Sequence, residues 1–180
     1  TSPKDLELYK NLLGDGSDFG LSLKFAVQHK PEGLAQAFLI AEEFIGNDAV
    51  CLILGDNVFW GPGLSEKLIR ASSIVEGATV FGYEVNDPER FGVVEIDSKG
   101  RALSVEEKPT SPQSNLAITG IYFYDNTVVE IAKSVIPSKR GELEIVDLLN
   151  HYKGKKQLSA DLMGRGGAWL DTGSIEDYYK

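Results

Sequence analysis

Two short, nearly unbroken apolar runs, residues 49–54 and 78–85, constrain the fold of this chain more than any other feature of its sequence. Runs of this length, bounded by turn residues, are typical of strands that are covered on both faces. A helical pattern at residues 64–75 separates them, and another at residues 34–45 precedes them. This alternation of strands and helices predicts an α/β fold with a largely parallel sheet in three layers.

The middle of the chain has a different pattern. Residues 91–96 alternate apolar and polar, and the turn residues 97–100 that follow indicate a hairpin whose second strand is residues 101–107. We expect further strands at residues 23–28, 117–124, 158–163 and 168–170, and further helices at residues 3–13, 127–134 and 144–152. Because no linker or internal repeat interrupts this order, the sequence predicts a single domain over residues 1–180 with a mixed sheet.

The charge of the chain limits its partners. Lys and Arg number 18 against 27 Asp and Glu, which gives a net charge of −9. Such a chain does not favour non-specific binding to the phosphates of nucleic acids or to anionic membranes. No apolar run approaches the ~20 residues of a membrane-spanning helix. The single cysteine, Cys51, excludes an internal disulfide and suits a reducing compartment, so we expect a soluble cytoplasmic protein.

Two aspartates come directly after predicted strands. Asp56 follows the strand at residues 49–54, and Asp171 follows the short strand at residues 168–170. Ligands of open α/β sheets bind beyond the carboxyl ends of the strands. Two carboxylates that converge there would suit Mg²⁺, held together with substrate phosphate oxygens. The alternative for each residue is an ordinary capping or turn aspartate.

Three further polar motifs are candidates for binding. The second hairpin strand ends on Glu107 and Lys108, an adjacent acid and base that could bind a sugar hydroxyl and a phosphate. Arg140 lies just before a predicted helix, where an anion could bind, and Gln28 precedes a turn that contains Gly33 and could read the edge of a base. The alternative for the charged residues is a solvent-exposed surface, with acids that favour the helix dipole.

Together and in this order, the motifs resemble those of the sugar nucleotidyltransferases, and within them the glucose-1-phosphate thymidylyltransferases. The motifs are residues 14–17, 28–37, 54–57, 86–94, 106–109, 119–125, 140–145 and 169–173. The resemblance covers essentially the whole chain. It implies a three-layer, Rossmann-like α/β nucleotidyltransferase domain with a mixed, mostly parallel sheet, in which a β-hairpin region at about residues 86–124 binds the sugar.

The resemblance also implies the reaction. A phosphate oxygen of glucose 1-phosphate attacks the α-phosphorus of dTTP, which yields dTDP-glucose, a precursor of dTDP-rhamnose and cell-surface polysaccharides, and releases pyrophosphate. No covalent enzyme intermediate is needed, so such a protein mainly positions groups and neutralises charge. Asp56, Lys108 and Asp171 are the implied catalytic residues, and the two aspartates hold Mg²⁺. A homo-oligomer is expected.

Nine residues are implied to bind the substrates: Gln28, Pro31, Gly33, Gly92, Glu107, Ile118, Tyr122, Arg140 and Trp169. The first three form the thymine pocket, where Gln28 and the backbone of Gly33 read the base. Arg140 and Lys108 bind phosphate. The remaining five residues form the sugar pocket. The Gly92 backbone and Glu107 bind glucose hydroxyls, and Ile118 makes a backbone contact. Tyr122 and Trp169 line the pocket.

The resemblance has a gap at each end. Members of the family open with a strand and a Gly-rich loop that ends in Gly-Thr-Arg, and neither is among these 180 residues; most of the family's C-terminal tail is absent as well. We therefore expect a domain that is incomplete at the N-terminus. One alternative is a catalytically silent fragment that still binds sugar phosphate and nucleotide. Another is a sibling enzyme that uses UTP or CTP, which the turn after Gln28 and residues 90–92 argue against.

Overall fold

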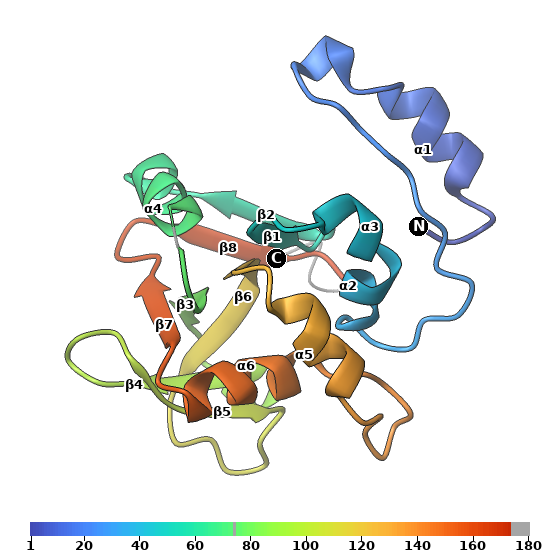
Figure 1. The fold of residues 1–180 in the computed structure, drawn as a ribbon. Helices are drawn as coiled ribbons and strands as arrows, with labels where there is room; N and C mark the ends of the chain where they lie inside the picture. Colours follow the sequence, from blue (N-terminus) through green and yellow to red (C-terminus); the bar gives the residue numbers. More distant parts are fainter. Residues whose placement is uncertain (74, 174–180) are drawn as a thin grey trace.

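The computed structural model describes residues 1–73 and 75–173 (Figure 1). Its α-helices are α1 (Leu6–Leu13), α2 (Gln36–Ile40), α3 (Glu42–Ile45), α4 (Leu64–Ser72), α5 (Val128–Ser134) and α6 (Ile145–Gly154), with short 3₁₀ helices η1 (Ser17–Phe19) and η2 (Pro88–Arg90). Its strands are β1 (Val50–Ile53), β2 (Asn57–Trp60), β3 (Ala78–Glu84), β4 (Gly92–Ile96), β5 (Ala102–Glu107), β6 (Leu116–Tyr124), β7 (Leu158–Leu162) and β8 (Ala168–Asp171). No helix in these ranges is long and apolar enough to cross a membrane.

Strand β6 organises the main sheet. Six strands form it, in the order β5-β4-β6-β3-β7, with β1 also paired to β6. Both β1 and β3 run antiparallel to β6, and Val50 and Ala78 both pair with Tyr124. The two apolar runs therefore point in the same direction, as their alternation with helices predicts, but β6 lies between them.

The mixed α/β fold is confirmed, but the expectation of a mostly parallel sheet is wrong. Among the described strands, β3 and β7 make the only parallel pair. The physical reason is that a strand covered on both faces reads as an apolar run whichever way its neighbours point. The long central strand β6, which pairs antiparallel on both sides, gave no sequence signal of its direction.

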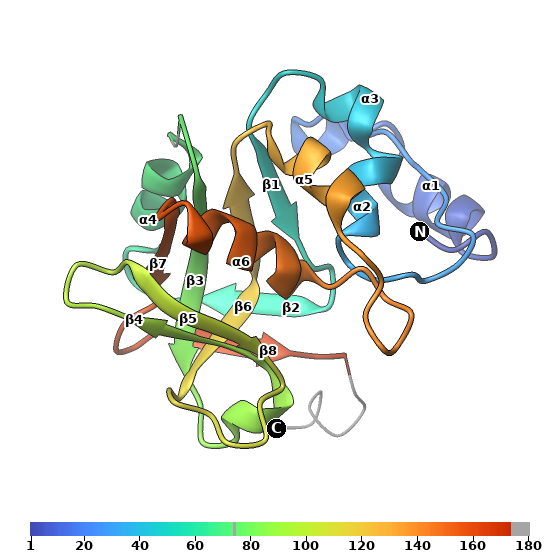
Figure 2. The same cartoon turned by 60° about the horizontal axis from the view of Figure 1, so that its bottom comes forward.

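The sheet is covered on both faces, so the three-layer arrangement is confirmed (Figure 2). Helices α2, α5 and α6 pack on one face, and α4 and the β2–β8 ribbon pack on the other. Strand β6 serves both cores because its side chains alternate: Tyr122 and Tyr124 enter the larger core, and Ile121 and Phe123 enter the smaller one. The site described below lies at the edge of the sheet where these layers end.

Strand β2 was not expected from the sequence. It pairs antiparallel with β8, so that Asn57 lies opposite Asp171 and Phe59 lies opposite Trp169. Val58 and Trp60 are exposed on this short ribbon, and the strand therefore lacks the apolar run that marks β1 and β3. The ribbon matters for function because it brings the two predicted metal-binding aspartates side by side.

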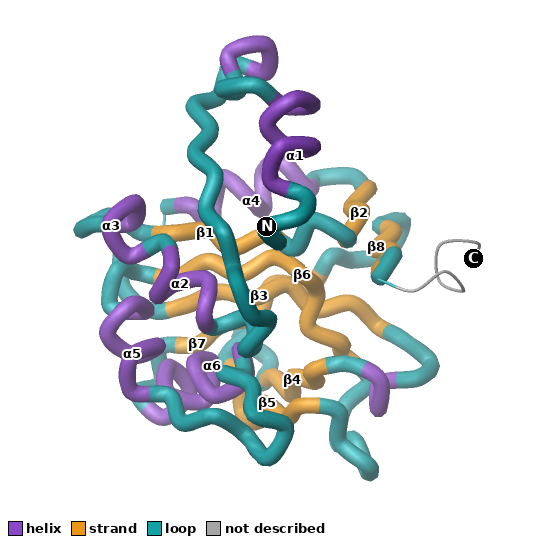
Figure 3. The backbone as a smooth tube through the Cα atoms, turned by 90° about the vertical axis from the view of Figure 1, so that its right-hand side faces the viewer, coloured by secondary structure: helices purple, strands orange, loops and turns teal. Residues whose placement is uncertain are grey.

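The N-terminal region departs most from expectation. Helix α1 ends at Gly14 as predicted, but it begins at Leu6 rather than at Pro3. It buries none of its residues and projects from the body of the molecule (Figure 3). Residues 23–28 are not a strand; the backbone N–H of Gln28 instead donates to Thr1, and the amino group of Thr1 donates to Ala26.

The segments that follow also differ in detail. The helix expected at residues 34–45 is broken at Ala41 into α2 and α3. Strand β1 is covered on one side only, since Cys51 and Ile53 are exposed. The expectation that residues 49–54 are covered on both faces is therefore wrong, because no described element packs over the face that carries Cys51 and Ile53. Strand β1 also pairs with β6 alone, and no other described strand lies beyond it.

Candidate active site

Most of the predicted site residues line one cleft, whose volume is about 390 Å³. Nine of the predicted residues lie there: Asp56, Gly92, Glu107, Lys108, Ile118, Tyr122, Arg140, Trp169 and Asp171. They come from β4, β5, β6 and β8 and the residue directly after β5, from the turn before β2, and from the loop before α6. We call this space the strand-end cleft.

The carboxylates of Asp56 and Asp171 face one another across the end of the β2–β8 ribbon. The backbone N–H and the hydroxyl of Thr172 donate to the Asp56 carbonyl, at 2.8 and 2.6 Å. A methyl group built on Gly173 would lie 3.1 Å from both Asp171 Oδ1 and Asp56 Oδ2. Two carboxylate oxygens thus border one small space that the glycine leaves open.

This donor set fits Mg²⁺, which is bound in phosphoryl-transfer sites by one or two carboxylates together with substrate phosphates and water. In the ranges 1–73 and 75–173, no cluster of three or more His, Cys, Asp or Glu side chains is arranged to hold a metal. Asp56 and Asp171 would therefore need oxygens from a ligand to complete a coordination shell.

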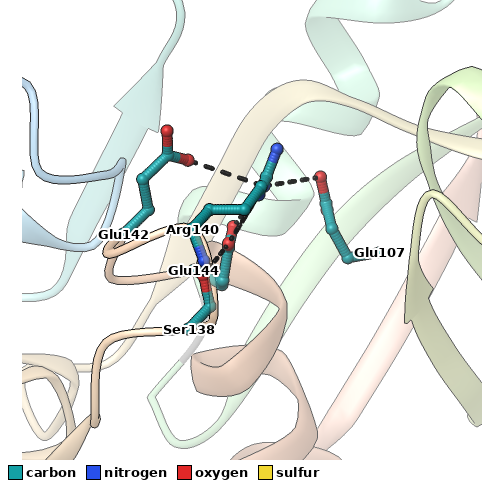
Figure 4. Close-up of polar contacts among 5 residues, drawn as sticks. All are labelled: Glu107, Ser138, Arg140, Glu142 and Glu144. Atoms are coloured by element: carbon teal, nitrogen blue, oxygen red, sulfur yellow. Dashed lines mark hydrogen bonds and ion pairs between the residues drawn. The ribbon is translucent and has the colours of Figure 1, made fainter.

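Arg140 lies in the cleft among carboxylates (Figure 4). Its Nη2 lies 2.9 Å from both oxygens of Glu144, 3.5 Å from Glu142 and 3.6 Å from Glu107, and Ser138 donates to Glu144 at 2.7 Å. The hydrogen bonds to Glu144 raise the pKa of Arg140. For Arg140 to bind phosphate as predicted, the phosphate must replace part of this carboxylate shell.

Glu107 and Lys108 form the opposite wall. Glu107 pairs with Gly92 across the β4–β5 hairpin, and burial raises the pKa of its carboxyl, with Lys108 opposing the shift. Lys108 has a positive φ of 42°, and its backbone N–H donates to Phe91 at 3.0 Å. Its ammonium is exposed and makes no ion pair within the described residues. The carboxylate of Glu107, which could accept hydrogen bonds from hydroxyls, therefore lies next to a lysine that makes no ion pair within the described residues.

The other three predicted residues line a separate cleft of about 740 Å³, which we call the loop cleft. Gln28, Pro31 and Gly33 lie there, and Leu34 and Glu142 line both clefts. The structure therefore does not bring all twelve predicted residues into one cavity. It places the predicted base-reading residues in an adjoining space that shares a wall with the strand-end cleft.

The loop cleft is held by contacts with the segment that carries Arg140. The backbone N–H of Leu143 donates to Glu32 at 2.7 Å, and Ala35 donates back to Leu143 at 3.2 Å. The Gln28 amide donates to Gln36 at 2.5 Å, and Gln36 donates to Glu32 at 2.7 Å. The loop that could read a base is thus docked on the residues that border the other cleft.

Several residues that line the strand-end cleft were not predicted as site residues: Leu34, Leu54, Asn57, Arg90, Phe91, Gly120, Glu142, Glu144, Ile145 and Val146. All of them except Val146 lie within the motifs listed above, and for Asn57, Glu142 and Glu144 adjacency to Asp56 and Arg140 was a further signal. Gly120 lies in the motif at residues 119–125, but no role was assigned to it, since its role depends on what packs against it.

The fold and the two clefts define an α/β domain with a candidate ligand-binding site at the edge of its sheet. The chain matches the nucleotidyl transferase family over residues 1–180, and it belongs to that family. It is 57% identical over 180 residues to a glucose-1-phosphate thymidylyltransferase of Neisseria meningitidis, and 52% identical over 176 residues to one of Mycolicibacterium smegmatis. All or nearly all of this chain is covered (100% and 98%), but it spans only 62% and 61% of the lengths of these relatives.

Solved structures have the same fold. A Bacillus anthracis crystal structure, assigned as a glucose-1-phosphate thymidylyltransferase in complex with sucrose, is 39% identical with a TM-score of 0.86, and the match covers 99% of this chain and 71% of that one. A UDP-glucose pyrophosphorylase complexed with UDP-glucose is 25% identical with a TM-score of 0.78, and the match covers 96% and 69% of the two chains.

Proposed function

We propose that this chain binds dTTP and glucose 1-phosphate and transfers the thymidylyl group to the sugar phosphate, giving dTDP-glucose and pyrophosphate. The observation that carries the proposal is the pair of adjoining clefts. One holds two facing carboxylates, a half-buried glutamate and a lysine that makes no ion pair within the described residues, and the other holds the turn after Gln28. The names of the relatives above support the same choice of sugar and nucleotide.

In this proposal the strand-end cleft binds the sugar. Glu107 accepts hydrogen bonds from glucose hydroxyls, and the backbone groups of Gly92 and Ile118 make further contacts. Tyr122 and Trp169, both buried, form the apolar wall against which the ring lies. Burial of the glutamate strengthens its hydrogen bonds, because charge-assisted bonds gain strength where water is excluded.

The phosphates lie between the sugar and the aspartates. Lys108 binds the phosphate of the sugar and holds its oxygen for in-line attack on the α-phosphorus, while Arg140 exchanges carboxylate for phosphate contacts as the ligand enters. Asp56 and Asp171 would hold Mg²⁺, which when bound offsets the charge of the phosphates. Positioning and charge neutralisation provide the rate acceleration in this class of reaction.

The base occupies the loop cleft. The Gln28 amide and the backbone at Gly33 hydrogen-bond to the edge of thymine, and Pro31 shapes the pocket. Because Leu34 and Glu142 line both clefts, a nucleotide bound there can direct its phosphates toward the aspartates.

Pyrophosphate release from dTTP and glucose 1-phosphate with Mg²⁺ tests this function, with UTP and CTP run in parallel. We expect turnover with dTTP, and a loss of at least about 10³-fold in Asp56→Ala, since charge stabilisation by the metal supplies several kcal/mol. Asp18→Asn, an exposed acid remote from both clefts, serves as the control. Binding of both substrates by calorimetry without any turnover would support the second candidate, a silent binding fragment.

Two further expectations, on oligomeric state and cellular location, belong to the same proposal. We keep the homo-oligomer and the cytoplasmic location that the family resemblance implies. Exposed apolar side chains on the β1 and β2 strands, Ile53, Val58 and Trp60, provide a surface for self-association. Light scattering coupled to size-exclusion chromatography checks this, and a monodisperse monomer at all concentrations contradicts it.

A further inference from the structure

The side chain of Asn57 connects three parts of the strand-end cleft. Its Nδ2 donates to Asp56 Oδ1 at 2.8 Å. Its Oδ1 accepts two hydrogen bonds, from the backbone N–H of Gly120 on β6 at 3.1 Å and from the indole Nε1 of Trp169 on β8 at 2.6 Å. One half-buried amide therefore joins the turn that carries Asp56 to two separate strands.

These partners fix the orientation of the amide. Both the backbone N–H of Gly120 and the indole N–H of Trp169 can only donate, so the atom they share must be the carbonyl oxygen of Asn57. The amide nitrogen then has to point at Asp56. Gly120 is part of this arrangement, because a methyl group built on it would lie 2.6 Å from Asn57 Oδ1.

The bond from Asn57 distinguishes the two oxygens of Asp56. It occupies Oδ1, whereas Oδ2 borders the space beside Gly173 that Asp171 Oδ1 also borders. Asp56 itself is exposed, so without this bond its carboxylate would be free to rotate. Fixing the orientation of the carboxylate before a ligand binds removes part of the entropic cost of binding.

We propose that Asn57 is a positioning residue for the cation site: it directs Asp56 Oδ2 toward the space shared with Asp171 and ties that orientation to β6 and β8. This inference rests on the proposed function only through the assignment of Asp56 as a ligand of the metal. Asn57 acts through Asp56, as second-shell hydrogen bonds commonly act on metal-binding carboxylates.

Binding of Mn²⁺ tests the inference directly. The dissociation constant is measured by electron paramagnetic resonance of free Mn²⁺, without nucleotide because free dTTP would itself bind Mn²⁺, for the wild-type chain and for Asn57→Ala, Asp56→Ala and Asn126→Ala. We expect Asn57→Ala to weaken Mn²⁺ binding about tenfold, the range in which outer-shell partners act, and Asp56→Ala to abolish it. Asn126 also donates one side-chain amide bond, to Asn47 at 3.0 Å, but lines neither cleft, so Asn126→Ala should bind Mn²⁺ like the wild type.

The Trp169 indole gives a second readout that needs neither metal nor turnover. The chain has two tryptophans, so in a Trp60→Phe background Trp169 is the sole indole. Its Nε1–H resonance should be shifted downfield and exchange slowly with solvent, and Asn57→Ala should remove both properties. If Asn57→Ala does not fold, Trp169→Phe removes one anchor of the amide and should weaken Mn²⁺ binding by a smaller factor, about threefold.

The outcomes separate the two proposals. If Asp56→Ala abolishes Mn²⁺ binding while Asn57→Ala, or Trp169→Phe in its place, binds like the wild type, the positioning role is overturned and the proposed function stands. If Asp56→Ala itself binds Mn²⁺ as tightly as the wild type, the metal assignment fails, and the positioning role fails with it.

Discussion

The strand-end cleft and the loop cleft adjoin, but they are built in different ways. The first is lined by residues of β4, β5, β6 and β8, whose relative positions are set by strand register. The second is lined largely by the turn after Gln28 and by residues of the N-terminal segment 1–28, which forms no strand. Register fixes the first geometry through many hydrogen bonds, whereas a few backbone bonds to Leu143 hold the second.

This difference predicts different weak points. In the loop cleft, a single change of backbone shape should displace the whole binding loop, because few hydrogen bonds fix it. In the strand-end cleft, the backbone should tolerate change, and the loss of one half-buried charge should matter most.

Gly33→Ala should have the largest effect. Gly33 has a φ of +102°, and an added methyl group would lie within 2.5 Å of the Leu143 backbone nitrogen. The loop must therefore move or adopt a strained conformation, at about 1–3 kcal/mol, and we expect dTTP affinity to fall about 100-fold. Calorimetric titration with dTTP measures this dissociation constant.

Gly14→Ala is the matched control for this change. Gly14 has a similar positive φ of +57° but no atom within 4 Å of an added methyl group, so it introduces the strain without the collision. If Gly33→Ala binds dTTP like Gly14→Ala, then the loop cleft is not the nucleotide site.

Glu107→Gln should have the next largest effect, confined to the other cleft. The amide keeps the shape but removes a half-buried charge, whose hydrogen bonds are worth about 1.5–3 kcal/mol. We expect kcat/KM for glucose 1-phosphate to fall about 30-fold, with the dissociation constant of dTTP unchanged. Its neighbour Glu106 is exposed, so Glu106→Gln should leave both values unchanged; equal losses in the two variants would contradict a sugar site at Glu107.

The two clefts also differ in how well the sequence predicted them. The strand-end residues were predictable because Asp56, Glu107 and Asp171 each end an apolar or alternating run, and the carboxyl ends of strands are where such sheets bind ligands. The hairpin turn at residues 97–100 and the bounds of β3 and β6 followed from the same patterns. What the patterns did not contain was strand direction, and so the central position of β6 was missed.

The rest depended on tertiary contacts. The role of Gln28 was suggested by the turn after it, yet the expected strand at residues 23–28 did not form because no neighbouring strand pairs with it. Asn57 and the carboxylate shell of Arg140 emerge only when β2, β8 and the loop before α6 meet. An amide that bridges three elements leaves no periodic signal in any of them.

Gln28→Ala should have a smaller effect, on selectivity more than on affinity. If the amide reads the base through one neutral hydrogen bond, its loss removes about 1 kcal/mol, and the preference for dTTP over CTP should fall about fivefold. Competition between the two nucleotides for turnover measures the ratio. Gln113, in an exposed loop outside both clefts, gives the control variant Gln113→Ala, and an unchanged ratio in Gln28→Ala would assign base choice to other residues.

The pH dependence of sugar binding should show the smallest effect, about threefold. Burial raises the pKa of Glu107, so its carboxyl takes up a proton at a higher pH than an exposed glutamate does, and loses the charge that accepts the hydroxyl bonds. Affinity for glucose 1-phosphate should therefore weaken as the pH falls toward that raised pKa. The phosphate of the ligand also titrates, at a pH of about 6, but its contribution to the pH dependence is the same for Glu107→Gln. The difference between the pH profiles of wild type and Glu107→Gln isolates the glutamate, and parallel profiles would mean that the charge of Glu107 does not contact the sugar.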